Sequence, residues 1–125
     1  MSYEVLRNTL AHAEKFIAQL PNRPVRSQAT REQLIATLSA PLPEQGEDPE
    51  RTIALLAKAG EEGTMASAGP RYFGFVIGGS LPVSVAADWL TTTWDQNAGV
   101  YATSPIASVI EDVAADWLLD RKSVV

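Results

Sequence analysis

The sequence predicts a mostly α-helical fold, with about five helices and one short extended segment. Two observations lead to this fold class. Apolar residues recur at steps of three and four in five stretches, which is the spacing of one face of an α-helix. The remaining stretch is uncharged except for one arginine, rich in glycine and aromatic, which is typical of an extended segment between turns.

The first predicted helix carries a single apolar stripe and ends at Pro21, because proline cannot continue a helix. A connector rich in proline, residues 21–29, follows it. The stripe consists of Leu6, Leu10, Ala13, Ile17 and Leu20.

Local start signals mark the next two helices. Thr30 is a candidate N-cap, and Gln33 stands three positions later as the other half of a capping box. The pair Asp48-Pro49 combines a cap with a proline in the first turn. That third helix is expected to end at Gly60 and Gly63.

Two further helices are expected beyond the glycine-rich segment. Pro82 begins one that reaches Trp94, and Ser104-Pro105 begins the last. We therefore divide the chain into a helical arm (1–63), a glycine-rich aromatic segment (64–81), two helices (82–120) and a tail (121–125). The last helix has the clearest apolar stripe: Ile106, Val109, Ile110, Val113, Ala114, Trp117 and Leu118.

Charge and composition exclude several classes of protein. The net charge is −5 with no cluster of Lys or Arg, which argues against nucleic-acid and anionic-membrane partners. The chain has no cysteine, so disulfides and thiolate chemistry are excluded. No signal peptide or membrane-spanning run is present in the sequence, and we expect a cytoplasmic protein.

Candidate catalytic and metal-binding groups are weak. His12, the single histidine, stands among charged residues and is predicted to be a solvated surface side chain. Asp112, Asp116 and Asp120 recur every fourth residue and are interpreted as a solvated helix face rather than an acid/base pair. No spacing matches a metal site.

The glycine-rich segment offers two binding hypotheses. Gly78 and Gly79 precede a predicted helix start, where free amides attract anions, although a simple turn into that helix is favoured. Strand alternation would place Tyr72, Gly74 and Val76 on one side and Phe73, Phe75 and Ile77 on the other. Both sides are then apolar, so burial by a ligand, by a partner chain or by the chain's own core is expected.

Residues 69–120 resemble the N-terminal region of the group II pyridoxal-phosphate-dependent amino-acid decarboxylases. Several short motifs carry this resemblance, in order along the chain. They are the aromatic run Pro70 to Phe75, Gly79 to Pro82 (Gly-Ser-x-Pro), Ala87-Asp88, Ser104-Pro105, Glu111 and Trp117-Leu118. Weaker similarity extends back to the first helix.

The resemblance implies a parent enzyme of the α/β aspartate-aminotransferase-like fold, type I, that works as a homodimer. Its N-terminal helices wrap over the neighbouring subunit and help to close the substrate pocket. The implied substrate-binding positions are Tyr72, Phe75, Val76, Ile77, Gly78, Asn97 and Gly99. They are less aromatic than in the aromatic-amino-acid enzymes, which counts against an aromatic substrate.

The family's cofactor-binding residues have no counterpart among Lys15, Lys58 and Lys122. The tail RKSVV continues no family pattern, and we expect a chain interrupted by a frameshift, a premature stop or the choice of expressed segment. We therefore expect an N-terminal arm of a carboxy-lyase that binds no pyridoxal phosphate and is inactive alone. The alternative is an independent helical interaction module that docks on a full-length homologue.

Overall fold

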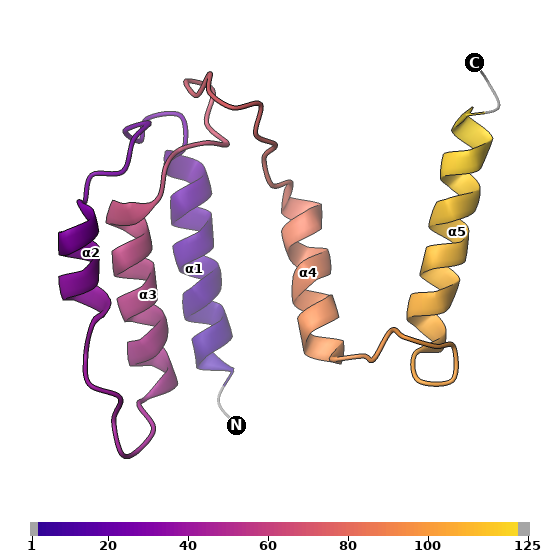
Figure 1. The fold of residues 1–125 in the computed structure, drawn as a ribbon, viewed down its shortest axis with the longest axis horizontal. Coiled ribbons are helices and arrows are strands. Elements are labelled where there is room, and N and C mark those ends of the chain that lie inside the picture. The colour runs from indigo at the N-terminus through magenta and orange to yellow at the C-terminus, as the bar shows by residue number, and fades with distance from the viewer. Residues whose placement is uncertain (1–2, 123–125) are drawn as a thin grey trace. The chain divides into compact units, whose positions relative to one another are not determined.

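The computed structural model describes residues 3–122 and contains five α-helices over that range (Figure 1). The mostly helical fold class is thus confirmed, and the described residues contain no β-strand. The chain divides into two units, Met1–Gly79 and Ser80–Val125. The predicted tail falls largely outside the described residues, since only its first two positions lie within the last helix.

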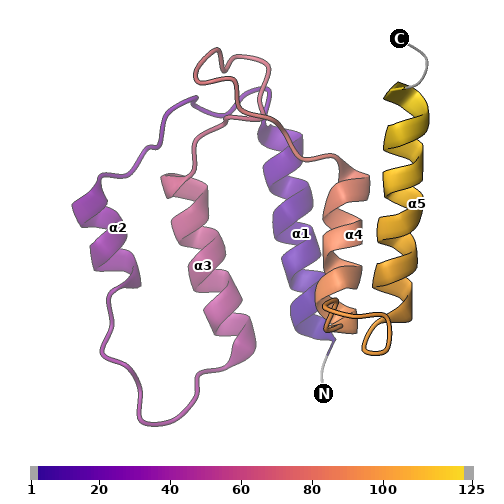
Figure 2. The same ribbon diagram turned by 45° about the vertical axis from the view of Figure 1, so that its right-hand side comes forward.

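The first unit contains three helices: α1 (Glu4–Gln19), α2 (Arg31–Leu38) and α3 (Pro49–Gly63). Helix α3 contacts both of the others and lies between them (Figures 1 and 2). At the α2 contact, Leu34 packs so closely over Gly63 that a Cβ there would lie 2.8 Å from a Leu34 methyl carbon.

The predicted start signals of α2 and α3 are confirmed. The hydroxyl of Thr30 accepts a hydrogen bond from the Gln33 amide, and the Gln33 side chain accepts one from the Thr30 amide. Asp48 Oδ1 accepts from the amides of Glu50 and Arg51, at 2.8 and 3.1 Å. These bonds satisfy amides that a helix cannot satisfy internally, so each helix begins where its cap stands.

The connectors of the first unit are tied together by backbone hydrogen bonds. The amide of Gln28 donates to the Glu62 carbonyl at 2.8 Å, and the amide of Ala66 donates to the Val25 carbonyl at 3.0 Å. Gly69 lies so close to the backbone of Leu20 that a Cβ added to Gly69 would be 2.9 Å from the Leu20 carbonyl oxygen. Connector 21–29 and the segment after α3 therefore hold one another in place.

The second unit contains α4 (Pro82–Trp94) and α5 (Pro105–Lys122). Within the described residues these two helices do not contact each other. Asp95 ends α4 in the left-handed conformation, and a turn-rich loop leads to Ser104, which is fully buried. The amide of Ala107 donates to Ser104 Oγ at 3.4 Å, which confirms the predicted start of α5.

The prediction of an extended segment at 64–81 is wrong. The chain forms turns around 67–71 and 74–76, and Phe75 and Val76 take positive φ values of 54° and 50°. The predicted alternation of side chains therefore breaks at Gly74 to Val76. The physical reason is that a single strand finds no second strand to satisfy its backbone groups, so the backbone turns instead.

The described residues bury almost no apolar side chain. Ala59 and Ala66 are the buried hydrophobic residues, 5% and 2% exposed, and both are small. A folded domain normally buries most of its Leu, Ile, Val and Phe. The apolar faces of these helices consequently remain open to solvent.

Candidate functional site

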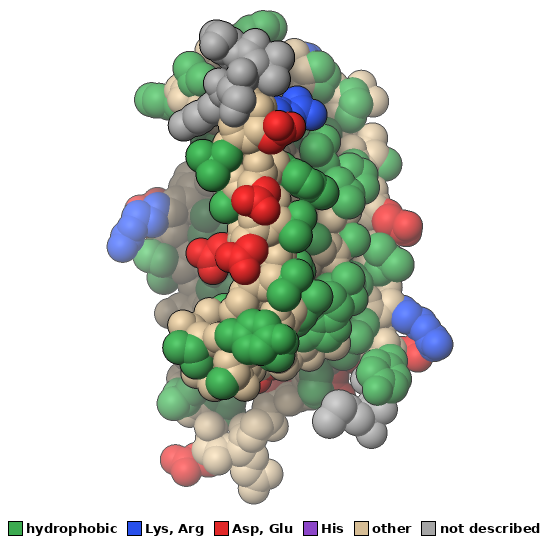
Figure 3. Space-filling model, turned by 90° about the vertical axis from the view of Figure 1, so that its right-hand side faces the viewer, with side chains coloured by type: hydrophobic (Ala, Val, Ile, Leu, Met, Phe, Trp, Pro, Cys, Tyr) green, Lys and Arg blue, Asp and Glu red, His purple; other side chains and the backbone are tan. Residues whose placement is uncertain are grey.

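An uncovered apolar surface of the second unit runs along α5. We call it the α5 face, and its exposed members are Ile106, Val109, Ile110, Val113, Trp117 and Leu118. Trp117 and Leu118 are 71% and 68% exposed, values that are unusual for large apolar side chains arranged in one stripe. Hydrophobic side chains gather on this side of the molecule beside a row of acidic ones (Figure 3).

A second exposed surface is the turn at 73–77, which we call the aromatic loop. Phe73, Phe75 and Val76 are at least 90% exposed, and Ile77 is 53% exposed. The chain's own core therefore does not bury this segment. Of the three ways of burying it that the sequence allowed, burial by a ligand and burial by a partner chain remain. The left-handed backbone at Phe75 and Val76 costs about 1–2 kcal/mol per residue for L-amino acids with large side chains. Burial of the side chains by a partner or a ligand would offset that cost.

The substrate-binding positions implied by the resemblance fall into two groups. Tyr72, Phe75, Val76, Ile77 and Gly78 lie in or beside the aromatic loop of the first unit. Tyr72 is half-buried because its ring folds over Gly74, where an added Cβ would lie 3.1 Å from the phenol oxygen. These five are near neighbours in the sequence, and the turn leaves Phe75 and Val76 almost fully exposed.

Asn97 and Gly99 form the second group, in the loop between α4 and α5. Asn97 Oδ1 accepts a hydrogen bond from the Gly99 amide at 3.1 Å, and the Asn97 carbonyl accepts one from the Thr103 hydroxyl at 2.7 Å. Both residues are exposed. The asparagine amide therefore shapes a projecting turn, which presents Val100 and Tyr101 at its surface, 59% and 64% exposed.

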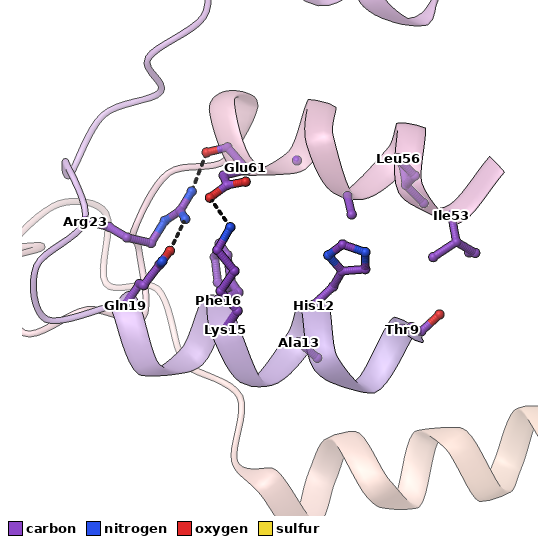
Figure 4. Close-up of a pocket in the computed structure, with 12 residues that line it drawn as sticks. Thr9, His12, Ala13, Lys15, Phe16, Gln19, Arg23, Ile53, Leu56 and Glu61 are labelled. Carbon is purple, nitrogen blue, oxygen red and sulfur yellow. Dashed lines mark hydrogen bonds and ion pairs between the residues drawn. The ribbon is translucent and has the colours of Figure 1, made fainter. Parts of the chain in front are cut away.

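A groove of about 270 Å³ lies between α1 and α3 (Figure 4). Its floor is apolar, with Ala13 and Phe16 from α1 facing Ile53, Leu56 and Ala57 from α3. His12, Lys15, Gln19, Arg23 and Glu61 form its rim.

The polar end of this groove is an interaction network. Lys15 Nζ donates to Glu61 Oε1 at 2.9 Å, and the Arg23 guanidinium donates to the Glu61 carbonyl oxygen and to Gln19 Oε1. The same guanidinium lies 4.6 Å from the centroid of the Phe16 ring, within the range of a cation–π contact. Because these side chains bind one another, the network joins α1 to α3.

The pKa of Glu61 is lowered from its ordinary value of 4.5. The largest cause is the hydrogen bond from Lys15, followed by the positive charge of Lys15, while partial desolvation opposes both. The charges of Arg23 and His12 lower it further. Glu61 is consequently a carboxylate at neutral pH and holds its ion pair there.

The described lysines do not fit the cofactor site of the resembled family. Lys15 is bound to Glu61 at the mouth of an open groove, and Lys58 is exposed on α3. A Schiff-base lysine acts from a pocket whose other groups hold the cofactor ring and orient its nitrogen. These two lysines have no such surroundings, and we assign no cofactor chemistry to them.

Other predicted groups stand where the sequence places them. His12 is exposed, and Asp112, Asp116 and Asp120 form a solvated helix face, as predicted. Gly78 and Gly79 are exposed before α4, whose N-cap position, Leu81, makes no side-chain cap bond. Within residues 3–122 no group of His, Asp and Glu side chains is arranged to hold a metal ion.

No helix in the described part of the chain combines the length and the hydropathy needed to cross a bilayer. Comparison with protein families, with characterised proteins and with solved structures gives no match to this chain.

Proposed function

We propose that this chain acts as the N-terminal dimerisation and substrate-pocket arm of a pyridoxal-phosphate-dependent amino-acid decarboxylase. The single observation that carries the proposal is the lack of a core. Five well-formed helices leave many large apolar side chains exposed on their faces, and Ala59 and Ala66 are the buried hydrophobic residues among those described. Such faces are stable when another polypeptide covers them.

The resemblance of residues 69–120 to the decarboxylase arm supplies the identity of that polypeptide. An arm that wraps over a neighbouring subunit needs helices with outward apolar faces and loops that project from them. The α5 face provides the first, and the aromatic loop and the Asn97 turn provide the second. In this proposal the substrate pocket is completed by the loops, and the cofactor is held by other residues of the parent enzyme.

The direct test of this function is the coding DNA beyond the codon for Val125, read in all three frames. A frame that continues into a long chain with the family's cofactor lysine supports the decarboxylase arm. A clean stop followed by unrelated sequence in every frame removes that support. In that case the alternative function takes its place.

The alternative is an independent interaction module that docks on a full-length homologue. The observation in its favour is that capped helices and hydrogen bonds between connectors hold the first unit together. It predicts saturable binding of the isolated chain to a purified homologous decarboxylase. A titration by calorimetry that shows no binding up to high micromolar concentration would rule it out.

A further inference from the structure

The groove between α1 and α3 is polar at one end and apolar at the other. Gln19, Arg23 and Glu61 lie at the polar end, while Ile53 and Leu56 lie towards the opposite end (Figure 4). Leu56 is 61% exposed although it lines the groove. The groove thus leaves apolar surface uncovered next to a charged end, an arrangement that suits an amphipathic ligand.

The charged side chains that line the groove carry an excess of positive charge. The ammonium of Lys15 and the guanidinium of Arg23 stand against the carboxylate of Glu61. This local excess is opposite in sign to the net charge of the whole chain, which is −5. The polar end therefore attracts an anionic group and repels an organic cation.

Both cations have more hydrogen-bond donors than the described residues occupy. An ammonium has three donors, and Lys15 Nζ uses one of them on Glu61 Oε1. A guanidinium has five, and that of Arg23 uses one on the Glu61 carbonyl oxygen and one on Gln19 Oε1. The remaining donors suit a carboxylate, because its two oxygens accept several hydrogen bonds and pair with the guanidinium fork.

The size of the groove limits the ligand. Its volume of about 270 Å³ lies just below the range of roughly 300–1,000 Å³ that is usual for drug-sized ligands. Lys15 and Thr9 are six residues apart on α1, so the groove extends about 9 Å along the helix between them. A helix of a partner protein, about 10–12 Å across, is too wide for this space.

We propose that this groove binds a small fatty carboxylate. The carboxylate accepts hydrogen bonds from Lys15 and Arg23, and the alkyl tail covers Ala13 and Phe16 and extends to Leu56. The site goes beyond the proposed function, because all of its residues belong to the first unit and no second chain contributes to it.

Simpler ligands satisfy only one end of the groove. Acetate or phosphate would meet the donors of Lys15 and Arg23 but leave the apolar floor uncovered. Octylammonium would cover the floor but place its charge beside two cations. Since each buried methylene group strengthens binding by up to about fourfold, a tail as long as that of octanoate adds most of the affinity.

An NMR titration of the full chain tests the site, with sodium octanoate as the probe. We expect saturable shifts of the Ala13, Phe16 and Ala57 amide signals, with a Kd of about 1 mM. Acetate, inorganic phosphate and octylammonium should each bind at least about tenfold more weakly. Equal affinity for any of these three would overturn the proposal, as would octanoate shifts that do not saturate or that avoid the groove.

Filling the groove provides the first pair of variants. Ala57→Leu extends a larger side chain over the floor and should weaken octanoate binding at least about tenfold. Ala36→Leu, the same substitution at an exposed position of α2, should leave binding unchanged. Circular dichroism checks that both variants keep their helix content. Equal binding by the two folded variants would place the ligand elsewhere and overturn the proposal.

Removing the guanidinium provides a second pair, which decides the matter even if Ala57→Leu does not fold. Arg23→Gln should weaken octanoate binding about tenfold, because a charge-assisted pair is lost. Arg26→Gln removes the same charge from an exposed position of the same connector and should have little effect. Unchanged binding by Arg23→Gln would overturn the site. Such a failure leaves the decarboxylase arm standing, since the coding DNA beyond Val125 tests that function separately.

Discussion

Lys15 Nζ and Glu61 Oε1 lie 2.9 Å apart, and this ion pair connects the first helix to the third across a sequence separation of 46 residues. It stands at the rim of a groove whose floor is apolar, next to the cation–π contact between Arg23 and Phe16. Both side chains of the pair are about half exposed. The pair therefore serves mainly to set the register of α1 on α3, and its strength depends on pH and salt.

The first prediction concerns this ion pair. Replacing Lys15 by Met removes the hydrogen bond and the charge, so the pKa of Glu61 should rise towards 4.5. In the unmodified chain the folded-state pKa is lowered, so the pair stabilises the fold above the unfolded-state pKa. This contribution is lost as the pH falls through the lowered value. An NMR titration of the Glu61 carboxyl carbon measures the change.

Lys58→Met is the matched control, because it removes the same charge from an exposed site on α3. It should leave the Glu61 titration close to that of the unmodified chain. An equal rise in the Glu61 pKa in both variants would mean that general charge, and not the Lys15 contact, lowers it.

The second prediction tests the close approach at Gly69. A methyl group there would lie 2.9 Å from the Leu20 carbonyl oxygen and 3.1 Å from the Ala66 carbonyl oxygen, and neither backbone atom can move freely. Gly69→Ala should therefore reduce the free energy of unfolding of the first unit by about 1–3 kcal/mol. Urea denaturation followed by circular dichroism provides the measurement.

Gly46 offers the control for this substitution. No atom outside its neighbours lies within 4 Å of a Cβ placed there, and its φ is not positive. Gly46→Ala should be neutral or stabilise by less than about 1 kcal/mol, since it only restricts the unfolded chain. Equal losses at both positions would show that the connectors are not in close contact.

The third prediction concerns the backbone of the aromatic loop. Asparagine tolerates the left-handed conformation better than a β-branched residue, so Val76→Asn should raise the stability of the isolated chain by up to about 1 kcal/mol. Ile77→Asn, a similar exchange at a position without positive φ, should give no such gain. Chemical denaturation of the two variants decides the matter, and a loss of stability in Val76→Asn would contradict the observed turn.

The fourth prediction tests whether the α5 face is an interface. Ile110→Glu places a charge within the apolar stripe and should weaken self-association roughly tenfold or more, with helix content unchanged. Ala115→Glu adds the same charge on the opposite side of the helix and should have little effect. Sedimentation equilibrium measures both. If the two variants associate equally well, the α5 face is not part of the interface.

The elements of this fold were predictable where their signals are local. Thr30 with Gln33, and Asp48 with Pro49, specify helix starts within four residues, and the structure begins α2 and α3 there. The turn at Phe75 and Val76 was not predictable, because neither phenylalanine nor the β-branched valine favours positive φ.

The contacts of the candidate site were only partly predictable from the sequence. The exposed carboxylates of α5 follow from helical periodicity, as does the surface position of His12. The Lys15–Glu61 pair and the Arg23–Phe16 contact bring together residues that are distant in the sequence or lie on a connector.

The loop between α2 and α3 has a practical consequence. Every residue from Ser39 to Glu47 is exposed, and the space around Gly46 is open. The hydrogen bonds that tie the first unit together join other segments, 21–29 and 62–69. A fluorophore or an affinity peptide inserted at Gly46 would therefore leave the three helices joined as they are. This loop is the attachment point from which the chain can be followed in a cell.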